Sequence, residues 1–203
     1  GFIGWYMVSS GLIDRIDVSH FRLSLHLVLA FFILSLILWN YLKLNEFNLL
    51  DQKMNLNIPF IFLILIFCQI TIGGFVSGMD AGKIYNSWPL MGAGFFPDDN
   101  QFVNLFEFAA FSDPSLVQFM HRNLAYLIFF YYLFILIKIY KNKLTKLFKA
   151  IKLIGFILII QIILGIFTLI YGAQIILSSM HQISSIFLVS SSIYFLYLNY
   201  NTS

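Results

Sequence analysis

The chain has 203 residues, of which 60% are hydrophobic and only 10% are charged, and its mean hydropathy is +0.87. A water-soluble domain usually carries about 25% charged residues, so the composition indicates an integral membrane protein instead. The formal net charge of +3 does not indicate nucleic-acid binding, because the lysines are concentrated in one linker. With a single cysteine, Cys68, the chain can form neither an internal disulfide nor a cysteine metal cluster.

Five apolar runs are long enough to cross about 30 Å of hydrocarbon, which takes about 20 helical residues. Each run is apolar all round, which is typical of membrane spans, and they lie at 21–42, 58–78, 118–138, 152–171 and 177–198. Residues 1–12 are predicted to be the end of a sixth helix. The chain starts with Gly1-Phe-Ile-Gly-Trp5, which is not a signal peptide, so we expect a fragment of a longer protein.

The charges of the loops predict which side of the membrane each loop faces. The linker 138–152 contains six lysines and no acidic residue, so the positive-inside rule makes it cytoplasmic. The linker 43–57 must then be cytoplasmic as well. The connection 79–117, with five acidic residues and one lysine, falls outside.

All four histidines fall near the outer ends of these helices. They are His20, His26, His121 and His181. Ionisable side chains within the membrane are costly and usually serve a function, although a residue near a helix end can also extend to the interface. The shared depth of the histidines, in the outer half of the membrane, predicts a common kind of site.

An internal repeat supports that prediction. Gly4 and Gly11 are seven residues apart and are followed by His20; Gly165 and Gly172 have the same spacing and are followed by His181. A Gln-x-x-x-Gly pattern also recurs, at 69–73 and 161–165. Glycine on a membrane helix allows another backbone, or a flat ligand, to approach closely.

The repeat leaves open which histidine of the first unit corresponds to His181. His20 matches by ungapped spacing, whereas removing an apparent loop insertion around 14–17 aligns His26 instead. Six helical residues turn the chain by about 600°, so the two side chains point about 120° apart and cannot share one iron. We favour His26, which lies deeper, and expect His20 to be an interfacial or entry residue.

Histidine pairs on facing membrane helices are a usual means of holding haem, and arginines near the interface suit its propionates. His121 and His181 would form one such axial pair. Arg22 and Arg122, at the outer starts of two helices, are the candidate propionate partners.

Several segments together resemble the haem A synthase family, polytopic enzymes that oxidise haem O to haem A. They cover nearly the whole chain and lie at 4–12, 18–26, 73–82, 84–91, 104–107, 117–122, 161–165 and 181–182. The resemblance implies an all-α transmembrane bundle of eight helices in two pseudo-repeated halves, of which this chain holds six. Residues 1–57 would be the remainder of the N-terminal half. Residues 58–203 would be the C-terminal half, with the long outer loop 79–117.

The resemblance also implies ligands and a reaction. Haem b would lie between His121 and His181, and His26 would face the iron of the substrate haem O. A catalytic glutamate and a partner histidine would lie on the missing helices, so no catalytic residue is assigned and the fragment is expected to lack a complete active site. The reaction would oxidise a haem methyl group to a formyl group, passing electrons to an unidentified acceptor.

Other implied partners are haem O synthase and oxidase assembly factors, since haem A serves a terminal oxidase. The location would be a bacterial plasma membrane or, alternatively, a mitochondrial inner membrane. A b-type cytochrome that only relays electrons is the alternative function, and a histidine-bearing bundle without cofactor is a third. Residues in the densest part of the resemblance are further candidates for holding propionates or the loop: Asp80, Lys83, Asn86 and Trp88. Similar cases are Asn104, Glu107 and Gln118.

Overall fold

The computed structural model describes residues 1–11, 18–45 and 54–200. Within those ranges the chain forms α-helices and short 3-10 helices, and an isolated bridge between Met91 and Gly94 is the only β pairing. Five helices are long and apolar enough to cross a membrane, which confirms the predicted all-α polytopic bundle. They are α2 (His20–Leu44), α3 (Asn57–Gly78), α4 (Pro114–Lys141), α5 (Phe148–Ile170) and α6 (Ile175–Tyr200).

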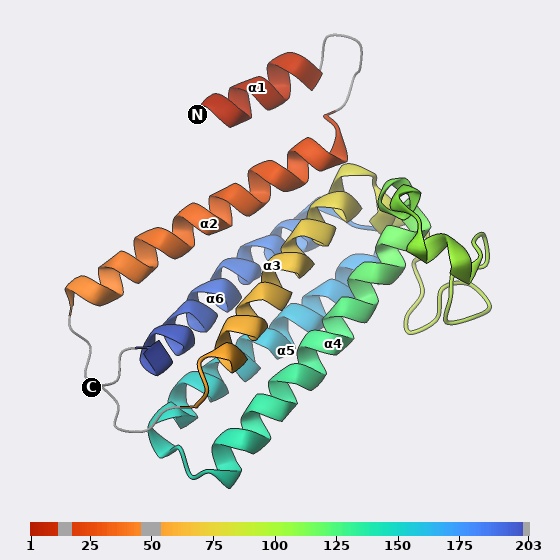
Figure 1. Cartoon of the computed structure of the whole chain (residues 1–203). Helices are drawn as coiled ribbons and strands as arrows, with labels where there is room; N and C mark the ends of the chain where they lie inside the picture. The colour runs from red at the N-terminus through yellow and green to blue at the C-terminus, as the bar shows by residue number, and fades with distance from the viewer. Residues whose placement is uncertain (12–17, 46–53, 201–203) are drawn as a thin grey trace.

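Helices α3 to α6 form a four-helix bundle (Figure 1). In it α3 packs against α4 and α6, and α5 packs against the same two helices, so α4 and α6 stand at opposite corners. Helix α2 lies against α3 and α6, and the short α1 (Phe2–Gly11) lies along α2. That α1 and α2 belong to a separate half, with a boundary near residue 57, stays a prediction.

Helix α4 begins one turn earlier than the hydrophobic run predicted. The carboxylate of Asp113 accepts a hydrogen bond from the backbone N–H of Leu116 at 2.9 Å, which caps the helix, and Pro114 occupies the first turn. At the other end Lys138 and Lys141 lie in the last turn, where cations favour the helix dipole. The sequence signal for the start of α4 was therefore the Asp113-Pro114 cap, which lies outside the apolar run.

The tightly packed core lies at the end of the bundle that carries the lysine linker. Its fully buried side chains come from all four helices and include Phe62, Ile135, Ile139, Leu147, Ile151, Ile154, Val189 and Phe195. Toward the opposite end, by contrast, no residue of 119–127, 159–170 or 175–187 is buried. At that end the buried residues belong to α3 and to the start of α4, among them Phe75, Leu116 and Val117.

A glycine brings α2 into contact with α3. A Cβ atom added to Gly74 would lie 2.7 Å from the Cα atom of Ser24, so the helix backbones touch there. The hydroxyl of Ser24 donates a hydrogen bond of 2.7 Å to the carbonyl oxygen of Thr71. Small residues and interhelical hydrogen bonds of this kind hold membrane helices together.

We expect Gly74→Ala to destabilise this crossing by about 1–3 kcal/mol, because the added methyl group meets backbone that must shift. The measurement is the free energy of unfolding in detergent. Ser77→Ala, at an exposed position on the same helix, is the control and should change little. Equal unfolding free energies for the two variants would contradict the close approach.

Candidate functional site

Three histidines each pack on a glycine of the preceding helix. A Cβ atom added to the glycine would lie 2.9 Å from Cε1 of His26 at Gly4, 3.2 Å from Cε1 of His121 at Gly73, and 3.1 Å from Cε1 of His181 at Gly165. Each ring therefore lies where a side chain on the neighbouring helix would otherwise be. We call these three contacts the glycine–histidine crossings.

His20 makes a different contact. Its Cα atom would lie 2.7 Å from a Cβ added to Gly78, and its ring meets the ring of Phe75 edge-on at 5.7 Å. His20 thus packs on α3, whereas His26 packs on α1. The position equivalent to His121 and His181 is that of His26, and the ungapped spacing that aligned His20 with His181 does not describe the packing. The role of His26 as a ligand stays a prediction.

His121 and His181 lie near the starts of α4 and α6, at the end of the bundle opposite the lysine linker. Those two helices stand at opposite corners of the bundle. Both histidines lie at a level where α5 and α6 bury no residue.

The Nδ1 atoms of both histidines are buried and have no hydrogen-bond partner. Buried polar atoms without a partner are rare in folded proteins and call for an explanation, such as an ion or ligand. The described part of the chain contains no group of three or more His, Cys, Asp or Glu suited to a metal ion. Two imidazoles alone would leave a bare ion short of ligands, whereas a porphyrin supplies its own ring nitrogens and needs only axial ligands.

The Gln-x-x-x-Gly pattern places a glutamine one turn from two of the crossings. The side-chain nitrogen of Gln69 lies 3.1 Å from Nε2 of His121 and donates a 3.0 Å hydrogen bond to the carbonyl oxygen of the same residue. At the second site the hydroxyl of Ser184 hydrogen-bonds to Oε1 of Gln161 and lies 2.9 Å from the carbonyl oxygen of His181. The pattern was visible in the sequence, but its contacts were not.

Arg122 binds the outer loop. Its Nη1 atom donates to the carbonyl oxygens of Ser87 (2.9 Å) and Leu90 (3.3 Å), and its Nη2 atom donates to that of Tyr85 (2.9 Å). The amide of Gln118 also donates to the carbonyl of Tyr85, at 3.1 Å. We call residues 82–90 the strap. Arg122 thus has a structural role, which is to hold the strap, and the sequence did not predict it. Its role toward a propionate stays a prediction.

Asn86 fixes the strap to α5, because its amide donates to the carbonyl oxygens of Gly82 (2.9 Å) and Leu169 (2.8 Å). The strap is therefore held at two places. Arg122, the residue after His121, binds it on α4, and the C-terminal end of α5, the helix that carries Gly165, binds it through Leu169. Lys83 pairs with Asp80 at 2.9 Å in an exposed position, and the side chain of Trp88 is exposed.

The remaining candidates lie elsewhere. The guanidinium of Arg22 lies 5.8 Å from the centre of the Tyr6 ring on α1. Glu107 is exposed on the outer loop, and Asn104 donates to Asn100 at 3.3 Å. These residues are not brought to the His121–His181 pair by the contacts described.

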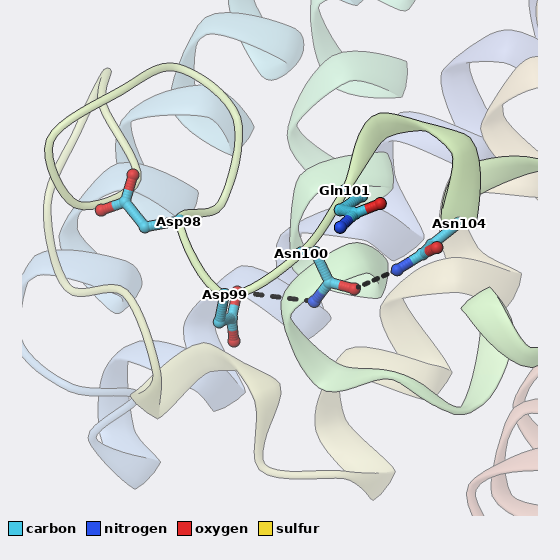
Figure 2. Close-up of a pocket in the computed structure, with 5 residues that line it drawn as sticks. All are labelled: Asp98, Asp99, Asn100, Gln101 and Asn104. Carbon is cyan, nitrogen blue, oxygen red and sulfur yellow. Dashed lines mark hydrogen bonds between the residues drawn. The ribbon is translucent and has the colours of Figure 1, made fainter.

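A polar pocket of about 460 Å³ lies in the outer loop (Figure 2), lined by Asp98, Asp99, Asn100, Gln101 and Asn104. Asp99 accepts hydrogen bonds from Tyr85 (3.0 Å) and Ser115 (2.6 Å), so it ties the strap to the start of α4. Partial burial acts to raise the pKa of Asp99, but hydrogen bonds from Ser115, Tyr85 and Asn100 outweigh it and lower that pKa below 3.8. These contacts make the pocket part of the loop's own framework.

The fold and the site define a class of protein: polytopic membrane bundles whose histidines lie on glycine crossings at one end. Comparison with known proteins specifies the class. The family model COX15-CtaA, described as cytochrome oxidase assembly protein, matches residues 1–193. The chain belongs to this family.

Curated relatives carry the name Heme A synthase. The chain is 49% identical over 202 residues to that of Pelagibacter ubique (99% of this chain, 59% of the relative). It is 42% identical over 195 residues to that of Rickettsia bellii strain OSU 85-389 (94% and 58%) and 41% identical over 204 residues to that of Rickettsia prowazekii (98% and 60%). The chain thus spans about three-fifths of the length of these relatives. No solved structure matches it significantly.

We expect Asn86→Ala to loosen the strap, because two hydrogen bonds worth about 0.5–1.5 kcal/mol each are lost. Amide hydrogen exchange in the strap should become several-fold faster. Asn40→Ala, which removes a bond within α2 only, is the matched control. Unchanged exchange in the strap would show that Asn86 does not hold it.

Asp99 makes the outer loop sensitive to acid. Because its pKa is lowered on folding, its stabilisation is fully present above the ordinary pKa of 3.8 and is lost as the pH falls through the lower folded value. Hydrogen-exchange protection at Tyr85 and Ser115, corrected for the intrinsic rate, should fall in that range. In Asp99→Asn this acid step should be absent, and its persistence would assign it to another group.

Proposed function

We propose that the protein is a haem A synthase, which oxidises a methyl group of haem O to a formyl group. The observation that carries the proposal is the pair His121 and His181. They occupy equivalent glycine–histidine crossings on opposite corners of a four-helix bundle, near the starts of α4 and α6. The names of the curated relatives support the same activity.

The residues present fit a b-type haem between these two histidines. Two imidazoles suit the axial positions of haem iron, and the absence of side chains at Gly73 and Gly165 makes room for the two rings. When bound there, a b-type haem supplies one-electron transfer. His121 and His181 would hold it as neutral imidazoles, and the strap anchored by Arg122 would limit the access of water from the outer end.

The substrate is proposed to lie on the side of α1 and α2. His26 repeats the crossing of the other two histidines, so we assign it to the iron of haem O. Arg22 lies on the same helix near Tyr6 and is the candidate for a propionate. Conversion of the methyl group to a formyl group takes one oxygen atom from water and releases four electrons and four protons. The electrons would be passed on, by way of the b-type haem site, to an acceptor that is not identified.

The location proposed is a bacterial plasma membrane, since the relatives named above are bacterial. The lysine-rich end of the bundle would face the cytoplasm under the positive-inside rule. The histidine sites would then lie in the outer half of the membrane. The product, haem A, would leave for a terminal oxidase.

The activity is tested by expressing the complete protein with haem O available and separating the extracted haems by chromatography. We expect haem A to appear only when the protein is present. An intact protein that carries b-type haem but makes no haem A would be an electron-relaying cytochrome, and the proposed reaction would be wrong.

Substitution of single histidines separates the two sites. We expect His121→Ala or His181→Ala to abolish the optical spectrum of the b-type haem, because one axial ligand is lost. His26→Ala should keep that spectrum and make no haem A, and His20→Ala should have a milder effect than His26→Ala. Loss of the b-type spectrum in His26→Ala would contradict the assignment of the b-type haem to His121 and His181 and of the substrate haem to His26. A larger loss of haem A in His20→Ala than in His26→Ala would make His20 the ligand.

A further inference from the structure

The two Gln-x-x-x-Gly patterns differ in what their glutamines contact. Gln69 reaches the imidazole of His121 directly, whereas Gln161 reaches the hydroxyl of Ser184, three residues after His181. The glycines of the two patterns contact the histidine rings in the same manner. The two copies of the repeat therefore share the glycine–histidine crossing, but they differ in whether the glutamine side chain contacts the histidine ring.

The contacts of Gln69 determine which amide atom faces the ring. One side-chain atom lies 3.0 Å from the carbonyl oxygen of His121 and 3.1 Å from its Nε2. That atom must be the amide nitrogen, since reversing the amide would set two carbonyl oxygens 3.0 Å apart with no proton between them. An amide nitrogen has two N–H donors and no available lone pair, so it serves both neighbours as a donor.

The same contacts determine where the imidazole carries its proton. Nε2 faces an N–H group and must accept, so in the neutral ring the proton lies on Nδ1. Free neutral imidazole side chains prefer the opposite tautomer. Nδ1 is buried without a hydrogen-bond partner, so no contact of its own holds the proton there.

We propose that Gln69 is a positioning residue that holds His121 in the tautomer whose Nε2 lone pair is available to iron. In the absence of iron the amide satisfies that lone pair and fixes the ring on Gly73. Gln161 does not do this for His181, so the two axial histidines are prepared differently. The part of this inference that concerns iron rests on the proposed haem site, whereas the tautomer itself does not.

The test compares Gln69→Leu with Gln161→Leu, each of which removes one glutamine of the repeat. Ring ¹⁵N NMR of the haem-free full-length protein in detergent reports which nitrogen is protonated, and the His121 signals are those missing from His121→Gln. We expect protonated Nδ1 and unprotonated Nε2 at His121 in the wild type and in Gln161→Leu. Gln69→Leu should shift His121 toward the Nε2–H tautomer.

Gln69 contacts the nitrogen that would bind iron, so iron would have to displace the amide, and the tautomer of His121 is the quantity that reports the role of Gln69. An unchanged His121 tautomer in Gln69→Leu would overturn the positioning role.

The outcomes separate this inference from the proposed function. If His121→Ala keeps the b-type spectrum, the haem site is wrong, but the NMR result still decides the role of Gln69. If the spectrum is lost in His121→Ala while the wild type shows the Nε2–H tautomer, the inference about Gln69 alone fails. Should Gln69→Leu not fold, the wild-type tautomer decides.

Discussion

The close approach of an imidazole ring to a glycine on the preceding helix is the contact on which this structure depends. It occurs between α1 and α2, between α3 and α4, and between α5 and α6, always near the same end of the molecule. Membrane helices gain little from hydrophobic burial against one another, so they associate through small residues and hydrogen bonds. Here the small residue also makes room for a ring. A structural contact and a proposed ligand position are thereby combined in one place.

The two ends of the bundle are held together by different contacts. At the lysine-linker end, branched and aromatic side chains from all four helices fill the space between them, as in most protein interiors. At the histidine end the buried apolar side chains come from α3 and α4, and polar contacts of Gln69, Gln118, Arg122 and Asn86 join the helices and the strap.

Much of the fold could be predicted from the sequence, because a membrane demands long apolar helices, and the five predicted runs form such helices. The start of α4 was missed by one turn, since Asp113 and Pro114 lie outside the apolar run that defined the span. The prediction that the histidines lie at a similar depth followed from their positions near the ends of the predicted helices. Spacing did not decide between His20 and His26, because both an ungapped and a gapped alignment of the repeat were possible; residues 12–17, where the gap would fall, lie outside the described residues.

The contacts of the site were harder to predict because they join segments that are distant in sequence. Arg122 suggested a propionate partner by its charge and depth, yet its nitrogens bind backbone carbonyl oxygens of the strap, which leave no trace in the sequence. The Gln-x-x-x-Gly pattern was visible, but only the structure distinguishes Gln69 on an imidazole from Gln161 on Ser184. A sequence motif does not show which side chains bind backbone atoms, because any residue type can supply those atoms.

The central claim is that His121 and His181 together ligate one iron. Electron paramagnetic resonance of the oxidised full-length protein tests it most directly, since two imidazole ligands make ferric haem low-spin. The wild type is predicted to show a low-spin signal that becomes high-spin or disappears in both His121→Ala and His181→Ala. In protein prepared without haem O, a low-spin signal that survives either substitution would contradict the claim.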